Sequence, residues 1–400
     1  MESPHQLNNF EYCCPTRMVF GEGAMERLPE LVPAGARVLL LYGGGSIKRN
    51  GVYDAVRRLL GARVVCEVGG VEANPDFDTC MRAVGVLRAH GADFVLAVGG
   101  GSVVDAAKFV TLAAGWTKSA DAHDIMVRWG AGQADRTWEP RAHCPLGVVL
   151  TLPATGSEMN NSAVISCRRL HEKCSVDHDS TLPAFAVVDP RATYTLPRRQ
   201  VANGLADAFV HVMEQYAGHH DMGRVQDEQA EGLLRALVDV APAALEMESP
   251  SYKARADLCW AATQALNLLL ACGVRQCWAT HRIGHMVTAY YGLDHAVTLA
   301  IVLPRLLRLL RPLRAPKLAR MAQRVWGVPR EGRSDDELAD LCIARCEAWF
   351  QSLGIATTFS ANGCDAAHFD AIAASFQGRR IGAEGTIGPD EVLLILKESL

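Results

Sequence analysis

The chain lacks a strong charge of either sign and lacks long apolar runs. Its 400 residues carry a formal net charge of −4, so no basic field is present to recruit nucleic acid or an anionic membrane. The apolar runs at residues 146–152 and 184–188 are far too short to span a bilayer. The first nine residues are polar and contain no apolar core of the secretion-signal type. We therefore expect a cytoplasmic protein with no membrane and no nucleic-acid partner.

The cysteines lack a recognisable spacing. There are 13 of them, an odd number, and none falls in the paired spacing of a zinc ribbon. Most are expected to be buried free thiols in a reducing compartment. We find no internal repeat and no low-complexity tract.

The composition is that of a folded globular protein, with 49% hydrophobic and 21% charged residues. At 400 residues, two domains are expected rather than one. The first half alternates short apolar runs with helical patterns, which is typical of parallel βαβ units. Strands are expected at residues 37–42, 63–68, 94–98, 146–152 and 185–188, and helices at 52–60, 77–90 and 103–114.

The pattern changes near residue 196. Strand signals nearly vanish beyond it, and Pro197 is a plausible first residue of a helix. The sequence therefore predicts an α/β domain of parallel strands at 1–196 and an all-helical domain at 197–400. Residues 116–143 are expected to form a long irregular connection. In the Leu/Arg-rich stretch that follows residue 303, three prolines are expected to break any single long helix: Pro304, Pro312 and Pro316.

Histidine and aspartate are spaced like metal ligands in the second half. Asp207 and His211 are four residues apart and share one face of a helix, and His281 and His285 repeat that arrangement. His295 follows the turn Y-Y-G-L-D. One carboxylate with two or three imidazoles suits a divalent metal that keeps an open position for chemistry. The alternative is a cluster of core histidines with satisfied hydrogen bonds.

Two glycine turns follow expected strands in the first half. The sequence G-G-G-S at Gly99, Gly100, Gly101 and Ser102 lies between a strand and a helix, where the backbone can approach a phosphate. It is not the G-x-G-x-x-G fingerprint, and a plain tight turn is the alternative. Asp105 would lie in the first helical turn, either as a cap or as a group that orients the cofactor or substrate.

The other glycine turn bears on the choice of cofactor. Proteins that bind NAD commonly place an acidic residue near such a strand end, but here the residues are Gly43, Gly44, Gly45 and Ser46. Lys48 and Arg49 lie close by, so the turn favours NADP. A third strand end carries T-L-P-A-T-G-S-E, whose Thr151, Thr155 and Ser157 suit hydrogen bonding to a cofactor, with a simple Ser/Thr turn as the alternative.

These motifs occur together and in order. G-G-G-S-V-V-D-A-A-K, T-G-S-E, D-P, D-A-F-V-H-V-M-E-Q-Y, H-R-I-G-H and G-L-D-H-A closely resemble the iron-dependent (group III) alcohol dehydrogenase family, from residue 15 to about residue 326. The triple-glycine turn, W-A-A-T-Q-A-L-N and L-A-I-V-L-P resemble its NADPH-dependent aldehyde reductase and butanol dehydrogenase branch.

The resemblance implies a Rossmann-like domain followed by a helical metal domain, the dehydroquinate synthase-like plan, with the active site in the cleft between them. It implies four metal ligands, Asp207, His211, His281 and His295, and places His285 beside the nicotinamide. It also assigns the cofactor to Gly44, Ser46, Gly99–Ser102, Thr151, Thr155, Ser157 and Lys173. Lys173 lies in R-R-L-H-E-K-C, a stretch that is unusually basic for the family and includes His171. His178, His219 and His220 match no family ligand and are expected to be surface or structural residues.

The resemblance predicts hydride transfer between NADP(H), preferred over NAD(H), and small aldehydes or primary alcohols. One divalent metal, Fe²⁺ or Zn²⁺, would polarise the carbonyl, and His285 or a water chain would supply the proton. A homodimer is expected as the commonest oligomer. The alternatives are a glycerol-dehydrogenase-like enzyme, a dehydroquinate-synthase-like enzyme and a non-catalytic binder. A dehydroquinate-synthase-like enzyme needs additional basic residues for its substrate, and only Arg275 and Arg282 near the metal helices offer them. Trp278, Tyr290 and Tyr291 are expected either to line a substrate pocket or to pack in the core.

Overall fold

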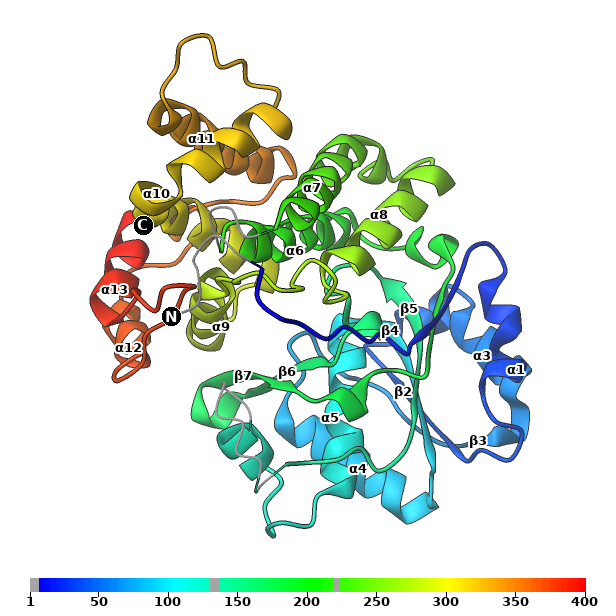
Figure 1. Ribbon diagram of the computed structural model, residues 1–400. Helices are drawn as coiled ribbons and strands as arrows, with labels where there is room; N and C mark the ends of the chain where they lie inside the picture. Colours follow the sequence, from blue (N-terminus) through cyan, green and yellow to red (C-terminus); the bar gives the residue numbers. More distant parts are fainter. Residues whose placement is uncertain (1–6, 130–136, 138, 219–222) are drawn as a thin grey trace. The chain divides into compact units, whose positions relative to one another are not determined.

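The computed structural model describes residues 7–129, 137, 139–218 and 223–400. It divides into two compact units (Figure 1). The sheet unit contains Cys13–Pro197 and Pro250–Thr263, and the helical unit contains the described residues of Met1–Tyr12, Arg198–Ser249 and Gln264–Leu400. The predicted α/β and all-helical fold classes are confirmed. The single domain boundary at residue 196 stays a prediction. Residues 7–12 belong to the helical unit and residues 250–263 to the sheet unit, so each of these segments lies across that boundary from the rest of its unit.

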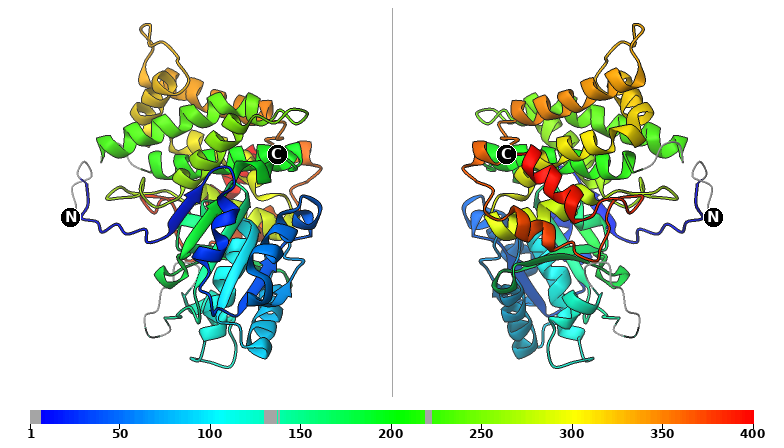
Figure 2. Two further views of the ribbon diagram at one scale, coloured as in Figure 1. Left: turned by 90° about the vertical axis from the view of Figure 1, so that its right-hand side faces the viewer. Right: turned by 90° about the vertical axis from the view of Figure 1, so that its left-hand side faces the viewer.

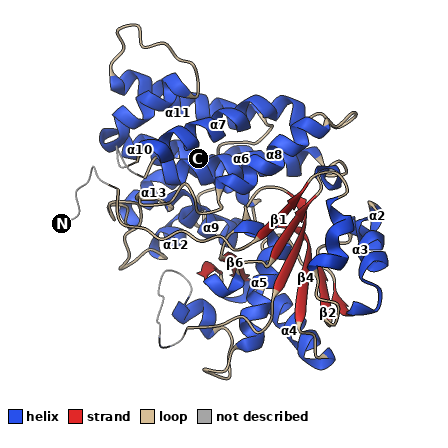
Figure 3. Cartoon of the chain, turned by 45° about the vertical axis from the view of Figure 1, so that its right-hand side comes forward, coloured by secondary structure: helices blue, strands red, loops and turns tan. Residues whose placement is uncertain are grey.

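The sheet unit is built on six parallel strands in the order β1-β8-β5-β4-β2-β3, drawn in red in Figure 3. The strands are β1 (Arg17–Phe20), β2 (Val38–Tyr42), β3 (Val64–Val68), β4 (Phe94–Gly100), β5 (Leu146–Leu152) and β8 (Phe185–Val188). Five of the six were predicted, because a parallel sheet covered on both faces needs continuous apolar strands. The first strand was missed, since its half-exposed residues form no such run.

Alternate strand residues enter two separate hydrophobic cores, one on each face of the sheet. Leu39 and Leu41 pack with helices α4 (Phe77–His90) and α5 (Gly101–Gly115). Leu40 and Tyr42 pack on the other face with α1 (Leu28–Leu31), α2 (Ser46–Arg49) and α3 (Val52–Leu60). The sheet is therefore held as the middle of three layers, and its strand ends are fixed in position.

A separate antiparallel hairpin, β6 (Ser162–Cys167) and β7 (Glu172–Asp177), packs beside α5. It was not predicted, because each strand has only six residues and neither shows a long apolar run or a regular alternation of polar and apolar residues. The predicted connection at 116–143 contains a short π-helical turn at Ile125–Trp129, and residues 130–136 and 138 lie outside the described part of the chain.

The helical unit contains most of the helices coloured from green to red in Figure 2. They are α6 (Arg198–Tyr216), α7 (Arg224–Ala244), α9 (Ala279–Tyr291), α10 (His295–Arg324), α11 (Asp335–Ser352), α12 (Phe369–Ala374) and α13 (Pro389–Glu398). Most of α8 (Tyr252–Ala265) belongs to the sheet unit, where Arg255 donates to the Thr193 carbonyl and Thr263 donates to Glu158. Among the described residues, no helix is long and apolar enough to cross a membrane.

The expectation that prolines break the helix after residue 303 is wrong. α10 runs continuously over 30 residues with Pro304, Pro312 and Pro316 inside it. Each proline removes a backbone donor, and an interior proline costs about 3 kcal/mol of helix stability. Tertiary packing offsets that cost, because most side chains from Ala296 to Ala322 on this helix are buried.

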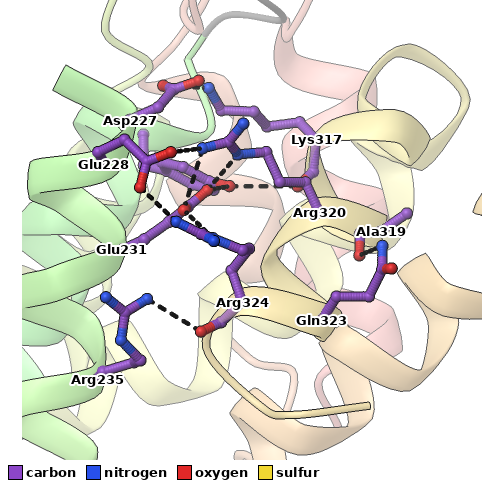
Figure 4. Close-up of polar contacts among 10 residues, drawn as sticks. Asp227, Glu228, Glu231, Arg235, Lys317, Ala319, Arg320, Gln323 and Arg324 are labelled. Carbon is purple, nitrogen blue, oxygen red and sulfur yellow. Dashed lines mark hydrogen bonds and ion pairs between the residues drawn. The ribbon is translucent and has the colours of Figure 1, made fainter. Parts of the chain in front are cut away.

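An ionic cluster ties α10 to α7 (Figure 4). On α7 the carboxylates of Asp227, Glu228 and Glu231 face the cations Lys317, Arg320 and Arg324 of α10. Asp227 and Lys317 form a pair that is almost fully buried. The buried Glu231 carboxylate also accepts a hydrogen bond of 2.8 Å from the Tyr216 hydroxyl at the end of α6. The cluster therefore fixes three helices of the unit to one another.

Candidate functional site

Helix α6 supplies one carboxylate and one imidazole to a buried polar cluster in the helical unit. Asp207 and His211 lie one turn apart, and Asp207 Oδ1 is 3.6 Å from His211 Nε2. Both side chains are only 5% exposed. The predicted spacing therefore brings these two groups together on the buried face of the helix.

Helices α9 and α10 bring two further imidazoles to the same oxygen. Nε2 of His281 and Nε2 of His295 each lie 3.8 Å from Asp207 Oδ1. Gly284 allows α9 and α10 to approach each other, since a Cβ added there would lie 2.8 Å from the Thr298 hydroxyl oxygen. Residues from three separate helices thus converge on one carboxylate.

The cluster fits a divalent metal ion. Ligand atoms of Asp207, His281 and His295 all lie within 4.8 Å of one another. The His211 ring stacks on the His281 ring at a centroid distance of 4.7 Å. In the described part of the chain the buried Nε2 of His281 has no hydrogen-bond partner, which suits a nitrogen that ligates a metal. An oxygen and three imidazole nitrogens match Fe²⁺ or Zn²⁺ and leave room for a further ligand.

Glu214 contacts this cluster and was not among the predicted residues. Its Oε1 accepts hydrogen bonds from the His281 backbone N–H at 2.9 Å and from His281 Nδ1 at 3.2 Å. A proton held on Nδ1 leaves the Nε2 lone pair for the metal. Burial lowers the pKa of His281, but the Asp207 and Glu214 carboxylates outweigh it and raise that pKa above the ordinary value. The signal was present in the sequence, because Asp207, His211 and Glu214 recur at i, i+4 and i+7.

His285 lies next to this cluster rather than among its three closest ligands. Its ring centroid is 5.2 Å from that of His295 and 6.3 Å from that of His281. The residue is 9% exposed. This position is compatible with the predicted role, in which the imidazole exchanges a proton without binding the metal.

In the sheet unit, the turn after β4 is more tightly packed than expected. The strand continues through Gly100 and α5 begins at Gly101, two residues before the predicted start. A Cβ on Gly99 would lie 2.5 Å from Val103, one on Gly100 would lie 2.9 Å from Leu152, and one on Gly101 would lie 2.4 Å from Thr155. The three glycines are therefore required by the packing around them, whatever else they bind.

The turn after β2 lies beside the turn after β4. The two strands pair up to Tyr42 and Val98, and a Cβ on Gly43 would lie 3.5 Å from Val103 of α5. A Cβ on Gly44 would meet none of the described atoms within 4 Å, Gly45 has a left-handed φ of +89°, and Ser46 begins α2. In the sheet, β3 lies on one side of β2 and β4 lies on the other, so the order of the strands reverses at β2. Such a change of direction is where open α/β sheets bind their ligands.

Lys173 reaches this same region through Asn74. Its Nζ donates to Asn74 Oδ1 at 2.8 Å, and the Asn74 backbone N–H contacts the Ser102 hydroxyl at 3.3 Å. Asn74 adopts a left-handed φ of 55° and was not predicted, although its Asn-Pro dipeptide marks a turn. The structure therefore connects Lys173 to Ser102 through Asn74, and the cofactor role of both residues stays a prediction.

Asp105 and Ser157 belong to a buried hydrogen-bond network. Ser157 donates to Asp105 Oδ1 at 2.6 Å, and Lys108 donates to Ser157 at 2.9 Å and to Asn160 at 3.0 Å. The expectation that Asp105 lies in the first helical turn is wrong, because α5 starts at Gly101. Burial lowers the pKa of Lys108 to about 8 and, against the opposing effect of Lys108, raises the pKa of Asp105. The network holds the segment after β5 against α5.

The remaining predicted residues have structural partners or lie outside the described part of the chain. Thr151 is buried at the end of β5, and the Thr155 hydroxyl accepts a hydrogen bond from the Ser157 N–H. His178 contacts Ser180 and Glu139. The Trp278 ring lies 5.2 Å from that of His281, and Tyr291 donates to the Asp365 carbonyl. His219 and His220 are not among the described residues.

Comparisons with known proteins cover nearly the whole chain. Residues 15–190 match the family model of iron-containing alcohol dehydrogenase, and residues 201–397 match that of the family's C-terminal domain. The chain is 47% identical to the NADPH-dependent aldehyde reductase YqhD of Escherichia coli K12 over 92% of each chain. It is 38% identical to a probable NADH-dependent butanol dehydrogenase of Bacillus subtilis over 98% of this chain and 100% of that one. The crystal structure of E. coli YqhD superimposes with a TM-score of 0.93 at 44% identity, covering 99% of this chain and all of the other.

Proposed function

Because the chain belongs to the iron-containing alcohol dehydrogenase family, we propose that it reduces small aldehydes to primary alcohols with NADPH and a divalent metal. The observation that carries this proposal is the convergence of three imidazole Nε2 atoms within 3.6–3.8 Å of one buried carboxylate oxygen. The family and a relative at 47% identity favour this activity over the glycerol-dehydrogenase-like, dehydroquinate-synthase-like and non-catalytic alternatives.

Asp207, His211, His281 and His295 would hold the metal. A divalent ion in that site supplies Lewis-acid polarisation of a carbonyl oxygen. Asp207 would contribute the single negative charge among the four ligands, so a divalent ion held there would retain one net positive charge to attract a carbonyl oxygen. Glu214 orients His281 through two hydrogen bonds. The donor set suits both Fe²⁺ and Zn²⁺.

His285 would hold and move the proton. An imidazole titrates near neutral pH and is suited to give up one proton and recover it within a turnover. His285 lies one helical turn after His281 on α9. From that position the imidazole would supply the proton that the alcohol oxygen gains, directly or through water.

The cofactor would bind where β2 and β4 end. The N-terminus of α5 offers N–H groups and the positive end of a helix dipole to the pyrophosphate. Residues 43–46 at the end of β2 include no acidic side chain of the kind that commonly holds the ribose of NAD. Lys173 and Lys48 supply cations, and Lys48 Nζ lies 5.0 Å from the centroid of the Tyr42 ring. These features support NADP(H) over NAD(H), although one relative at 38% identity is named for NADH.

A homodimer and a reducing, cytoplasmic location complete the proposal. All thirteen cysteines are free thiols, which agrees with a reducing compartment. Two-fold dimers are the commonest soluble oligomers, and sedimentation of the purified protein tests that state directly.

The test is the variant His295→Ala. We expect it to lose metal binding at the Asp207 site and NADPH-dependent butanal reduction, while NADPH still binds as followed by its fluorescence. A matched control is His178→Ala, whose ring contacts Ser180 and Glu139 in the sheet unit. Full turnover by metal-depleted His295→Ala would contradict the proposal. NADPH binding by the wild type without consumption of any aldehyde would favour the non-catalytic alternative.

A further inference from the structure

A second group of metal-ligating side chains lies in the sheet unit, on the β6–β7 hairpin. Cys167 ends β6 and Glu172 begins β7, and the two residues pair across the antiparallel ladder. Directly opposed residues project from the same face. His123, from the segment after α5, places Nε2 2.8 Å from Glu172 Oε2. The Cys167 sulfur, the His123 nitrogen and the Glu172 oxygen all lie within 4.8 Å of one another.

One side chain of this group is buried, and the other two are partly exposed to solvent. Cys167 is 1% exposed, while the Glu172 side chain is 43% exposed and that of His123 13%. The Phe77 ring packs edge-on against the His123 ring at 5.5 Å, and the His123 backbone N–H donates to Asp121. An ion could therefore enter past Glu172 and meet two side chains already held in place.

The ligand types specify the kind of ion. A thiolate and a carboxylate carry two negative charges, which a divalent cation neutralises, and the imidazole adds a neutral donor. Thiolate with imidazole suits Zn²⁺, whereas the Asp207 site contains no sulfur. Three protein ligands leave one tetrahedral position for water.

We propose that His123, Cys167 and Glu172 form a second divalent-metal site, selective for Zn²⁺ and separate from the Asp207 site. The bound ion replaces the hydrogen bond between His123 and Glu172, and the Cys167 thiol releases its proton. Because a thiolate is the metal ligand, the ion has to displace the thiol proton and its affinity falls as the pH falls. The ion clamps the segment after α5 to the hairpin and stabilises the folded state by mass action.

The site has a consequence for metal analysis of this protein. One zinc ion per chain would not show that zinc occupies the Asp207 site, because a zinc ion at Cys167 gives the same content. Comparison with Cys167→Ser separates the two assignments.

The test uses Co²⁺ as a spectroscopic substitute for zinc in the full-length protein. A bond between a thiolate and Co²⁺ produces a charge-transfer band in the near ultraviolet, and the Asp207 site has no sulfur to produce one. We expect wild-type protein to bind two Co²⁺ ions, of which one gives this band. Cys167→Ser should abolish the band and one equivalent of Co²⁺, while the other equivalent still binds.

Two further variants distinguish the loss of a metal ligand from a loss of folding. Glu172→Gln keeps a hydrogen-bond acceptor for His123 but removes a charge, so the band should persist with at least a tenfold weaker affinity. Cys174→Ser on the same hairpin is the matched control and should leave the band unchanged. The proposal fails if Co²⁺-loaded wild type shows no band, if the band survives in Cys167→Ser, or if Glu172→Gln titrates like the wild type.

Discussion

Substitution of Glu214 tests how the metal cluster is held. Both hydrogen bonds from His281 end on the same oxygen, Oε1. The variant Glu214→Gln can keep an acceptor for both N–H groups and removes only the negative charge. Glu214→Ala removes the acceptor as well and leaves the buried His281 backbone N–H without its partner. The pair of variants therefore separates the charge from the geometry.

The expected magnitudes follow from these contacts. Loss of an outer partner of a metal-bound histidine costs roughly 10–100-fold in metal affinity, or about 1.4–2.7 kcal/mol. We expect Glu214→Gln near the lower value, with little change in the free energy of unfolding. We expect Glu214→Ala near the upper value, with a further loss of about 1–3 kcal/mol of stability from the unsatisfied N–H.

The assay is a competition titration of Zn²⁺ against a chromophoric chelator, made in the Cys167→Ser background so that only the Asp207 site is measured, with urea unfolding of the metal-free protein alongside. Glu248→Gln is the matched control, because this glutamate is exposed on the same unit. Metal affinity that is equal in wild type and Glu214→Ala would refute the argument that Glu214 sets the orientation and tautomer of His281.

Three other predictions concern the packing around the sites. Gly101→Ala would place a Cβ 2.4 Å from Thr155, so we expect a loss of about 1–3 kcal/mol and a raised KM for NADPH in steady-state kinetics. Burial lowers the pKa of Lys108 from 10.5 to about 8, so between these two pH values the unfolded chain binds more protons than the folded one. The free energy of unfolding should therefore rise with pH across that window. Urea titrations should find this rise in the wild type and not in Lys108→Met. Asp227→Asn leaves Lys317, whose side chain is 1% exposed, without its carboxylate, and should lower the free energy of unfolding by about 3 kcal/mol or more. Glu231→Gln should lower it less, because the side chains of its partners Arg320 and Arg324 are 36% and 48% exposed. Equal shifts in Tm would contradict this ranking.

The parallel sheet could be predicted because its central strands are continuous apolar runs ended by glycine. The hairpin β6–β7 could not, because its two six-residue strands show neither a long apolar run nor a regular alternation of polar and apolar residues. Helix α10 was misjudged for a different reason. Proline acts locally, whereas the burial of α10 and its ion pairs with α7 are tertiary contacts that no local pattern reports.

The cluster around Asp207 was easier to predict than the residues that hold the candidate sites in place. Asp207, His211, His281 and His295 stand out because ligand chemistry restricts the residue types and their helical spacing. Glu214 was missed although it continues the same spacing, since a buried carboxylate that only orients a ligand leaves no separate signature. Asn74 connects Lys173 to Ser102 across long stretches of sequence, and only the fold reveals that connection.

The most direct test of the central claim is the consumption of NADPH and of NADH by the purified protein with butanal, before and after chelation of its metal. We predict faster loss of NADPH than of NADH, no turnover after chelation, and recovery on addition of Fe²⁺ or Zn²⁺. Turnover that persists in metal-free protein, or no turnover in metal-loaded protein with either cofactor, would contradict the account.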